Sequence, residues 1–183
     1  MPKIIIICGP SASGKNTIID SLLNKPEYNF ITVVTNTSRP KRPTDVDGKI
    51  YNFLSEKEFL SKIKIGFFIE YENTHGYLYG TSRYSFSKPG TYLMQSDIRG
   101  ALSIKKVYPD ILIIFINLPV SQIIKRLEDR GASESSIKTR LETAKREIAM
   151  KSKADVIVNN YDGKYKKALD TVQQAIDKYI AIR

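Results

Sequence analysis

The sequence has one cysteine, one histidine and no tryptophan. A single cysteine excludes an intrachain disulfide, and a single histidine excludes metal sites built on a pair of histidines. Cys8 ends an apolar segment, which favours a small buried side chain over a nucleophile. His75 precedes Gly76 in an expected turn, so we expect a surface or site-lining role for it rather than general-base catalysis.

Long hydrophobic runs are also missing. No stretch of about 18 apolar residues occurs, so we expect no membrane-spanning helix. The apolar run at residues 4–7 is too short for the core of a signal peptide, and we expect a cytoplasmic protein. The 183 residues, 42% of them hydrophobic, suffice for one α/β core with small insertions.

Acidic residues are outnumbered by basic ones, 19 against 29, which leaves a formal net charge of +10. A positive protein attracts phosphorylated partners and is compatible with nucleic acid. The lysines are dispersed and most of the arginines fall in two blocks, near residues 39–42 and 126–146. A nucleic-acid binder more often has one basic stripe with interleaved aromatic residues, so that function is disfavoured. The pattern specifies no oligomeric state.

Apolar periodicity predicts strands that alternate with helices. The predicted buried strands are 3–8, 91–94, 111–116 and 155–158, and the predicted helices are 15–23, 120–129 (after Pro119), 135–150 and 163–182. This alternation favours an α/β fold with a parallel sheet flanked by helices on both faces. Residues 32–90 are rich in turn residues and aromatics. About 60 structureless residues are unusual in a compact domain, so we expect a small mixed-β insertion with one helix at 55–65.

Residues 9–17 read Gly-Pro-Ser-Ala-Ser-Gly-Lys-Asn-Thr and fit the phosphate-binding pattern G-x-x-x-x-G-K. The pattern lies between a predicted buried strand and a predicted helix. Backbone N–H groups of such a loop converge on phosphate oxygens, and the helix N-terminus adds a favourable dipole. Lys15 supplies a cation for the β- and γ-phosphates. The sequence therefore predicts a nucleoside triphosphate site.

The position after the lysine departs from the pattern. It usually holds Ser or Thr, whose hydroxyl binds Mg²⁺, whereas this chain has Asn16. An amide carbonyl also ligates Mg²⁺, although the side chain is longer and carries a donor group. Thr17 does not simply replace the hydroxyl, because one residue along a helix rotates the side chain by about 100°.

The sequence resembles guanylate kinases, a family of P-loop nucleoside monophosphate kinases, along nearly its whole length. The resemblance rests on the phosphate loop and on ordered motifs at 35–42, 47–53, 67–71, 75–82, 96–100, 126–131, 138–141 and 158–160. It implies a P-loop core at 1–32, 91–125 and 151–183. It also implies a GMP-binding insertion at 33–90 and a helical lid at 126–150.

The resemblance implies a binding site for GMP or dGMP. Arg39, Arg42, Tyr51 and Tyr79 match residues that hold the acceptor phosphate, and Glu70 matches the residue that accepts from guanine N1 and its amine. Guanidinium groups suit phosphate oxygens, and phenol hydroxyls donate without adding charge.

Four further positions match the acceptor side. Thr35, Gly80 and Thr81 match residues near the base or the phosphate, and Asp97 matches the acidic residue near the acceptor nucleotide and the metal. With Asn16, Asp97 is a candidate ligand for Mg²⁺, the cofactor that the resemblance implies.

On the ATP side, the resemblance implies a set of loop residues, one late residue and a set of catalytic cations. The expected ATP-binding residues are Gly9, Ser11, Ala12, Ser13, Gly14, Lys15, Asn16, Thr17 and Asn159. The expected catalytic residues are Lys15, Arg42, Arg126, Arg130 and Arg140. We expect Arg126 and Arg130, four residues apart, to share one helix face. Taken alone they would be solvated charges.

The sequence departs from the family at three further places, two of them on the donor side. Gln95 stands where the family usually has aspartate, so two amides, Asn16 and Gln95, replace the usual groups. Ala12 stands where the loop usually has glycine, and a positive φ there would cost about 1 kcal/mol or more. The stretch from 81 to 90 is a few residues shorter than usual.

The resemblance implies a transferase of purine nucleotide metabolism that moves the γ-phosphoryl group of ATP to GMP or dGMP. One alternative is a guanylate-kinase-like module that binds a nucleotide or phosphopeptide without catalysis. Lys15 and the arginines at 126–140 speak against it, whereas Asn16 and Gln95 weakly favour it. A kinase of another phosphorylated acceptor is a second alternative, which Glu70 and Tyr51 disfavour.

Overall fold

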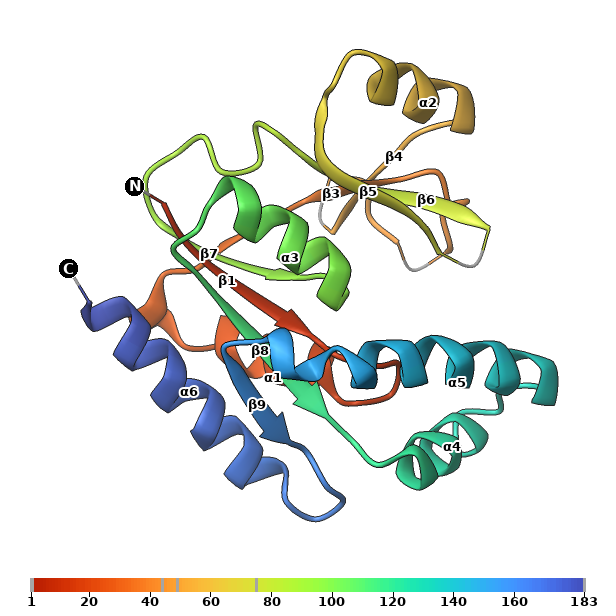
Figure 1. The fold of residues 1–183 in the computed structure, drawn as a ribbon, viewed down its shortest axis with the longest axis vertical. Helices are drawn as coiled ribbons and strands as arrows, with labels where there is room; N and C mark the ends of the chain where they lie inside the picture. The colour runs from red at the N-terminus through yellow and green to blue at the C-terminus, as the bar shows by residue number, and fades with distance from the viewer. Residues whose placement is uncertain (1, 44, 49, 75, 183) are drawn as a thin grey trace.

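The computed structural model describes residues 2–43, 45–48, 50–74 and 76–182 (Figure 1). Its core is a parallel five-stranded sheet in the order β2-β7-β1-β8-β9. The strands are β1 (Lys3–Cys8), β2 (Ile31–Thr32), β7 (Thr91–Gln95), β8 (Ile111–Asn117) and β9 (Val156–Asn159). Four of them confirm predicted strands. Because β1 is central, the loop that follows it emerges between the ends of β7 and β8.

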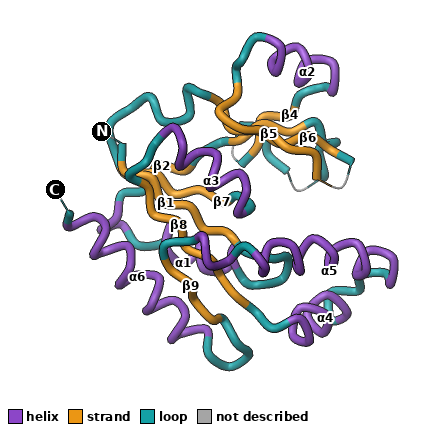
Figure 2. Tube along the Cα trace, viewed as in Figure 1, coloured by secondary structure: helices purple, strands orange, loops and turns teal. Residues whose placement is uncertain are grey.

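Helices cover both faces of this sheet (Figures 1 and 2). On one face, alternate residues of β1 such as Ile5 pack with α1 (Lys15–Leu23) and α6 (Tyr165–Ala181). On the other face, residues such as Ile4 pack with α3 (Ile98–Val107). The predicted parallel sheet between two helical layers is confirmed. Helix α3 was not among the predicted helices.

Two further helices, α4 (Val120–Glu128) and α5 (Glu134–Ala149), pack on each other through a small cluster that includes Ile123, Leu127 and Ala144. The last turn of α5 returns to the core, where Ile148 packs against the α3 face of the sheet. A short 3₁₀ turn (Lys151–Lys153) leads on to β9. The expectation that Arg126 and Arg130 share a helix face is wrong: α4 ends at Glu128, and Arg130 lies in the turn that follows.

The segment between β2 and β7 forms a second sheet in the order β4-β3-β6-β5. A 3₁₀ turn at Pro26–Tyr28 precedes it. The strands are β3 (Thr35–Thr37), β4 (Tyr51–Phe53), β5 (Phe68–Thr74) and β6 (Tyr77–Ser82), and α2 (Glu56–Lys64) connects β4 to β5. β3 pairs parallel with β4 and antiparallel with β6. The predicted mixed-β insertion with one helix is confirmed. Ser55 and Glu58 form a capping box at the start of α2.

Cys8 is fully buried at the end of β1, and this burial raises the pKa of its thiol to about 12. Its predicted role as a buried filler agrees with this placement. Among the described residues, no helix is both long enough and apolar enough to cross a membrane. The expectation for His75 falls outside the described residues, as does Lys49 of the motif at 47–53.

Candidate active site

The loop between β1 and α1 has the backbone conformation that a phosphate-binding loop requires. Gly14 has a φ of 91°, and a Cβ atom there would lie 2.3 Å from Asn160 Nδ2. Glycine is therefore needed for both conformation and space. The next residue, Lys15, begins α1, so the free N–H groups of the helix start point toward the site.

Ala12 has a φ of 62°, in the left-handed region that favours glycine. Glycine, which the family usually has at this position, adopts such a positive φ without strain, whereas alanine does not. Two side chains hold the carbonyls at this point. Arg126 Nη1 donates to Ala12 O at 3.0 Å, and Asn160 Nδ2 donates to Ser13 O at 2.7 Å. The strained turn is braced from outside the loop.

Lys15 lies inside the loop rather than in solvent. Its Nζ donates to Gly9 O at 2.6 Å and to Pro10 O at 2.8 Å. Burial lowers the pKa of Lys15 below its ordinary value, while the charge of Glu147 acts in the opposite direction. The ammonium is thus held among backbone carbonyls, beside the place where a phosphate would bind.

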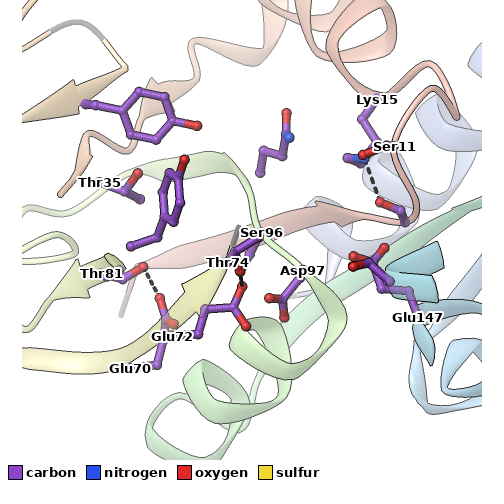
Figure 3. A pocket seen from close by; sticks show the side chains of 16 residues that line it. Ser11, Lys15, Thr35, Glu70, Glu72, Thr74, Thr81, Ser96, Asp97 and Glu147 are labelled. Carbon is purple, nitrogen blue, oxygen red and sulfur yellow. Dashed lines mark hydrogen bonds between the residues drawn. The ribbon is translucent and has the colours of Figure 1, made fainter. Parts of the chain in front are cut away.

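A cavity joins this loop to the second sheet (Figure 3). Ser11 and Lys15 lie on one side of it, and Thr35, Glu70 and Thr81 lie on the opposite side. Asp97, which caps the start of α3 by accepting from Gly100 N at 2.8 Å, lies between the two sides. The full lining comprises Gly9, Ser11, Lys15, Thr35, Tyr51, Glu70, Glu72, Thr74, Tyr79, Gly80, Thr81, Gln95, Ser96, Asp97, Thr143 and Glu147.

Glu70 presents a carboxylate at the far end of the cavity. Its Oε1 accepts from Thr81 Oγ1 at 2.5 Å, across the antiparallel pair of β5 and β6. Burial raises the pKa of Glu70, and the bond from Thr81 opposes that rise. The threonine fixes one oxygen and leaves the carboxylate directed at the cavity, where it can accept from a ligand with paired N–H donors.

Arg39 forms the centre of a cationic region next to this end. It is only 8% exposed, pairs with Asp45 at 2.9 Å, and lies over the rings of Tyr51 and Phe53. Arg42 donates its backbone N–H to the same Asp45 carboxylate at 2.7 Å. That bond and the bond from Arg39 hold the pKa of Asp45 below its ordinary value. The guanidinium of Arg39 is therefore positioned before any ligand arrives.

Helix α5 brings Arg140 to the same region. Arg140 lines a neighbouring cavity together with Arg39, Arg42 and Tyr79, and its Nε donates to Ser136 Oγ at 3.2 Å. Three predicted cations, from two distant parts of the sequence, thus line one cavity. Helix α5 and the segment of the second sheet line this cavity together.

Other predicted residues lie elsewhere. Among the described residues, the lining of the main cavity includes neither Arg126 nor Arg130, and Arg130 is exposed. Arg126 is bound to the outside of the loop and to Asp162 at 2.6 Å. Asn159 is exposed and accepts from Asn117 Nδ2 at 2.7 Å, and Thr17 is exposed on α1.

The residues on the expected metal side carry oxygen donors. Asn16 and Gln95 line one cavity, and Gln95 and Asp97 line the main one. Among the described residues, no group of three or more His, Cys, Asp or Glu side chains is placed to hold a metal ion. One carboxylate and two amide carbonyls suit Mg²⁺, which in kinase sites takes most of its ligands from phosphates and water. These residues therefore fit a metal that arrives with a nucleotide.

Three residues of the site were not among the predicted site residues, although Asn160 lies in the motif at 158–160. Asn160 is buried and holds the loop, as described above. Glu72 accepts from Arg99 Nη2 and from Thr74 Oγ1, each at 2.7 Å, and burial together with the neighbouring Asp97 raises its pKa. Glu147 projects from α5 into the cavity near Lys15 (Figure 3). Helical or strand spacing alone does not reveal such residues, because only the packing of distant elements brings them to the site.

A parallel sheet whose central strand leads into a phosphate-binding loop defines a P-loop protein, and one cavity separates this loop from the Glu70–Thr81 pair of the second sheet. Residues 1–179 match the family described as "Guanylate kinase". The chain belongs to the guanylate kinase family, as predicted.

Individual relatives support the assignment. The chain is 38% identical to the guanylate kinase of Thermotoga maritima, over 86% of this chain and 79% of that protein. It is 37% identical to the guanylate kinase of Clostridium acetobutylicum, over 98% of this chain and 83% of that protein. The crystal structure of guanylate kinase from Anaplasma phagocytophilum is similar over 100% of this chain and 87% of that one, with a TM-score of 0.75 at 23% identity. That structure has the same fold.

Proposed function

We propose that this protein is an ATP:GMP phosphotransferase, which transfers the γ-phosphoryl group of ATP to GMP or dGMP to give GDP or dGDP. The observation that carries the proposal is one continuous cavity with Lys15 at one end and the Glu70–Thr81 pair at the other. A triphosphate on the loop and a guanine on Glu70 would place their phosphates toward each other in this space.

GMP fits the acceptor end by its chemistry. Guanine presents N1–H and an exocyclic amine, two adjacent donors that adenine lacks, and the Glu70 carboxylate accepts both. Thr35, Gly80, Thr81 and Asp97 would complete the base site. Arg39 and Arg42, with Tyr51 and Tyr79, would hold the phosphate, and we propose residues 33–90 as the acceptor-binding insertion.

The reaction needs alignment and charge neutralisation rather than a general base, because a phosphate-monoester oxygen is already anionic. Lys15 and Arg42 would neutralise charge from opposite sides, and Arg140 of α5, which lines a cavity with Arg42, would add a third cation. We propose residues 126–150 as a lid that closes over the transferring group and excludes water. Arg126 and Arg130 join the site only after closure, since Arg126 must first exchange its bonds to the loop for phosphate.

We also propose which residues bind ATP, the phosphoryl donor, and Mg²⁺. The backbone of residues 9–17 would bind the triphosphate, and the exposed Asn159 would lie near the adenosine. Asn16, Gln95 and Asp97 would hold Mg²⁺ together with the nucleotide phosphates, and the metal would neutralise charge on them. A cytoplasmic location fits these substrates and the unpaired cysteine.

Production of ADP tests this function directly. ATP, Mg²⁺ and each nucleoside monophosphate in turn are supplied to the wild-type protein and to Lys15→Ala. We expect ADP only with GMP or dGMP, and at least about a hundredfold less in the variant, since Lys15 is the cation on the transferred phosphate. GMP binding without turnover of any monophosphate would instead indicate an inactive binding module. Turnover with a different acceptor would overturn the assignment of GMP.

A further inference from the structure

The carboxylate of Asp45 binds directly to the cationic region around Arg39. Its Oδ2 accepts from Arg39 Nη2 at 2.9 Å and from the backbone N–H of Arg42 at 2.7 Å. A turn holds the side chain there, because the backbone N–H of Asp45 donates to Arg42 O at 3.0 Å. The side chains of Arg39 and Asp45 are 9% and 19% exposed, so solvent screens this pair only in part. The turn thus fixes a carboxylate next to a nearly buried guanidinium.

The arginines of this region carry more charge than their acidic partner neutralises. Arg39, Arg42 and Arg140 line one cavity. Arg39 and Arg42 also line the next cavity, together with Asp45. Among the described residues, Asp45 is the only acidic side chain that pairs with any of the three arginines. The excess of two positive charges suits a phosphate monoester, whose charge is about −2 well above its second pKa of about 6.

A phosphate on Arg39 would need a donor that Asp45 already occupies. Guanidinium and backbone N–H groups bind phosphate and carboxylate oxygens alike. Nη1 of Arg39 donates to Pro40 O at 2.8 Å, and Nη2 donates to Asp45. Both bidentate arrangements on a guanidinium, through its two terminal nitrogens or through Nε and Nη2, use Nη2. A bidentate phosphate would therefore either replace Asp45 on Nη2 or share this nitrogen with it.

Asp45 carries its negative charge at neutral pH. The bonds from the Arg42 backbone and from the Arg39 side chain hold the pKa of this carboxyl below its ordinary value. In the ligand-free protein the charge stabilises the guanidinium of Arg39, which is expensive to bury without a partner. Once a phosphate is bound, the same charge lies next to another anion and repels it. The contribution of Asp45 thus changes sign when a phosphate binds.

We propose that the Asp45 carboxylate holds the place of the acceptor phosphate on Arg39 in the ligand-free protein, and that the phosphate of GMP takes over this bond. Asp45 is then a positioning residue with two effects: it orients the guanidinium before binding, and it limits the affinity of the site for the phosphate. The inference rests on the proposed function, since it takes GMP as the acceptor and Arg39 as a ligand of its phosphate. Asp45 is not among the site residues that the sequence predicted.

Two neutral variants of the full chain remove the charge and keep the turn. In Asp45→Asn the amide oxygen still accepts from the Arg42 N–H, and in Asp45→Ser the hydroxyl does so, as both residue types do in such turns. Asp20→Asn is the matched control. Asp20 is exposed, lines the same cavity as Asp45, and has no ion-pair partner among the described residues. Its variant therefore measures the general effect of removing one negative charge.

Calorimetric titrations with GMP and with guanosine, at about pH 7.5 and about 0.1 M salt, test the proposal. We expect both Asp45 variants to bind GMP about three- to tenfold more tightly than wild type, because two like charges a few Å apart repel by about this much even in water. Guanosine carries no phosphate, and its affinity should be the same in all four proteins within about twofold. The control should bind GMP within about twofold of wild type.

Unchanged or weaker GMP binding by the Asp45 variants would overturn the proposal and leave Asp45 as a residue that only orients Arg39. An equal gain in the affinity for guanosine, or an equal gain in the Asp20 variant, would also overturn it, because the effect would then not arise from the phosphate at Arg39. If wild type produces ADP with GMP and these results are negative, only this inference fails. If wild type binds no GMP, the proposed function fails with it.

Discussion

At the scale of single residues, the phosphate loop shows how one substitution is accommodated. Ala12 adopts the left-handed conformation that glycine adopts without strain, and the loop keeps its shape because Arg126 and Asn160 hold the neighbouring carbonyls. The sequence indicated where strain would fall if the position needed a positive φ. It did not indicate the brace, because Asn160 and Arg126 lie more than a hundred residues away in the chain.

Ala12→Gly should raise the free energy of unfolding by about 0.5–1 kcal/mol, because glycine adopts the left-handed conformation without strain. The gain is reduced because glycine also increases the conformational entropy of the unfolded chain. Urea unfolding measures the change. Asn29, with a φ of 44°, is the matched control, because asparagine tolerates this region better and Asn29→Gly should gain less. If Ala12→Gly gained no more stability than Asn29→Gly, the claim that the backbone of Ala12 is strained would be wrong.

At the scale of elements, α4 acts on the loop through one side chain. Arg126 connects the carbonyl of Ala12 with Asn160 O and the carboxylate of Asp162, so it links the loop to the segment after β9. The spacing of Arg126 and Arg130 suggested a shared helix face, but α4 ends between them. The end of a helix depends on local packing that spacing alone does not show.

Arg126→Gln should therefore destabilise the loop by about 1–3 kcal/mol, because two partly buried carbonyls lose a charged donor. We expect a lower unfolding midpoint and a higher KM for ATP, with the KM for GMP changed much less. Arg130→Gln removes the same charge from an exposed turn and should shift stability by less than about 0.5 kcal/mol. Equal effects of the two substitutions on stability would argue against a brace.

At the scale of the whole molecule, the main cavity forms where the parallel sheet, the second sheet and α5 meet, and this packing buries carboxylates. Glu147 from α5 and Glu72 from β5 both border the main cavity, and burial raises the pKa of each. Because folding raises these pKa values, the folded state binds protons more tightly than the unfolded chain does. The associated stability is fully present below the ordinary pKa and is lost as pH rises through the raised one.

The melting temperature of the nucleotide-free protein should consequently fall between about pH 5.5 and about pH 8.5, part of the fall coming from Glu147 near its pKa of about 7. Glu147→Gln should show a shallower fall, because the amide does not titrate. Glu142→Gln should keep the wild-type slope, since that side chain is exposed. Thermal scans at constant ionic strength measure all three, and parallel curves for wild type and Glu147→Gln would refute this origin of the slope.

The sequence by itself determined the phosphate loop, the alternation of strands and helices around it, the mixed-β insertion and the family. These features depend on local periodicity, on turn residues and on ordered motifs, all of which are properties of neighbouring residues. Only the tertiary structure decided that Arg126 and Asn160 brace Ala12, that Arg140 meets Arg39 and Arg42, and that Glu147 lies near Lys15. Such contacts join residues distant in the chain, and packing of the elements alone brings their charges into reach of one another.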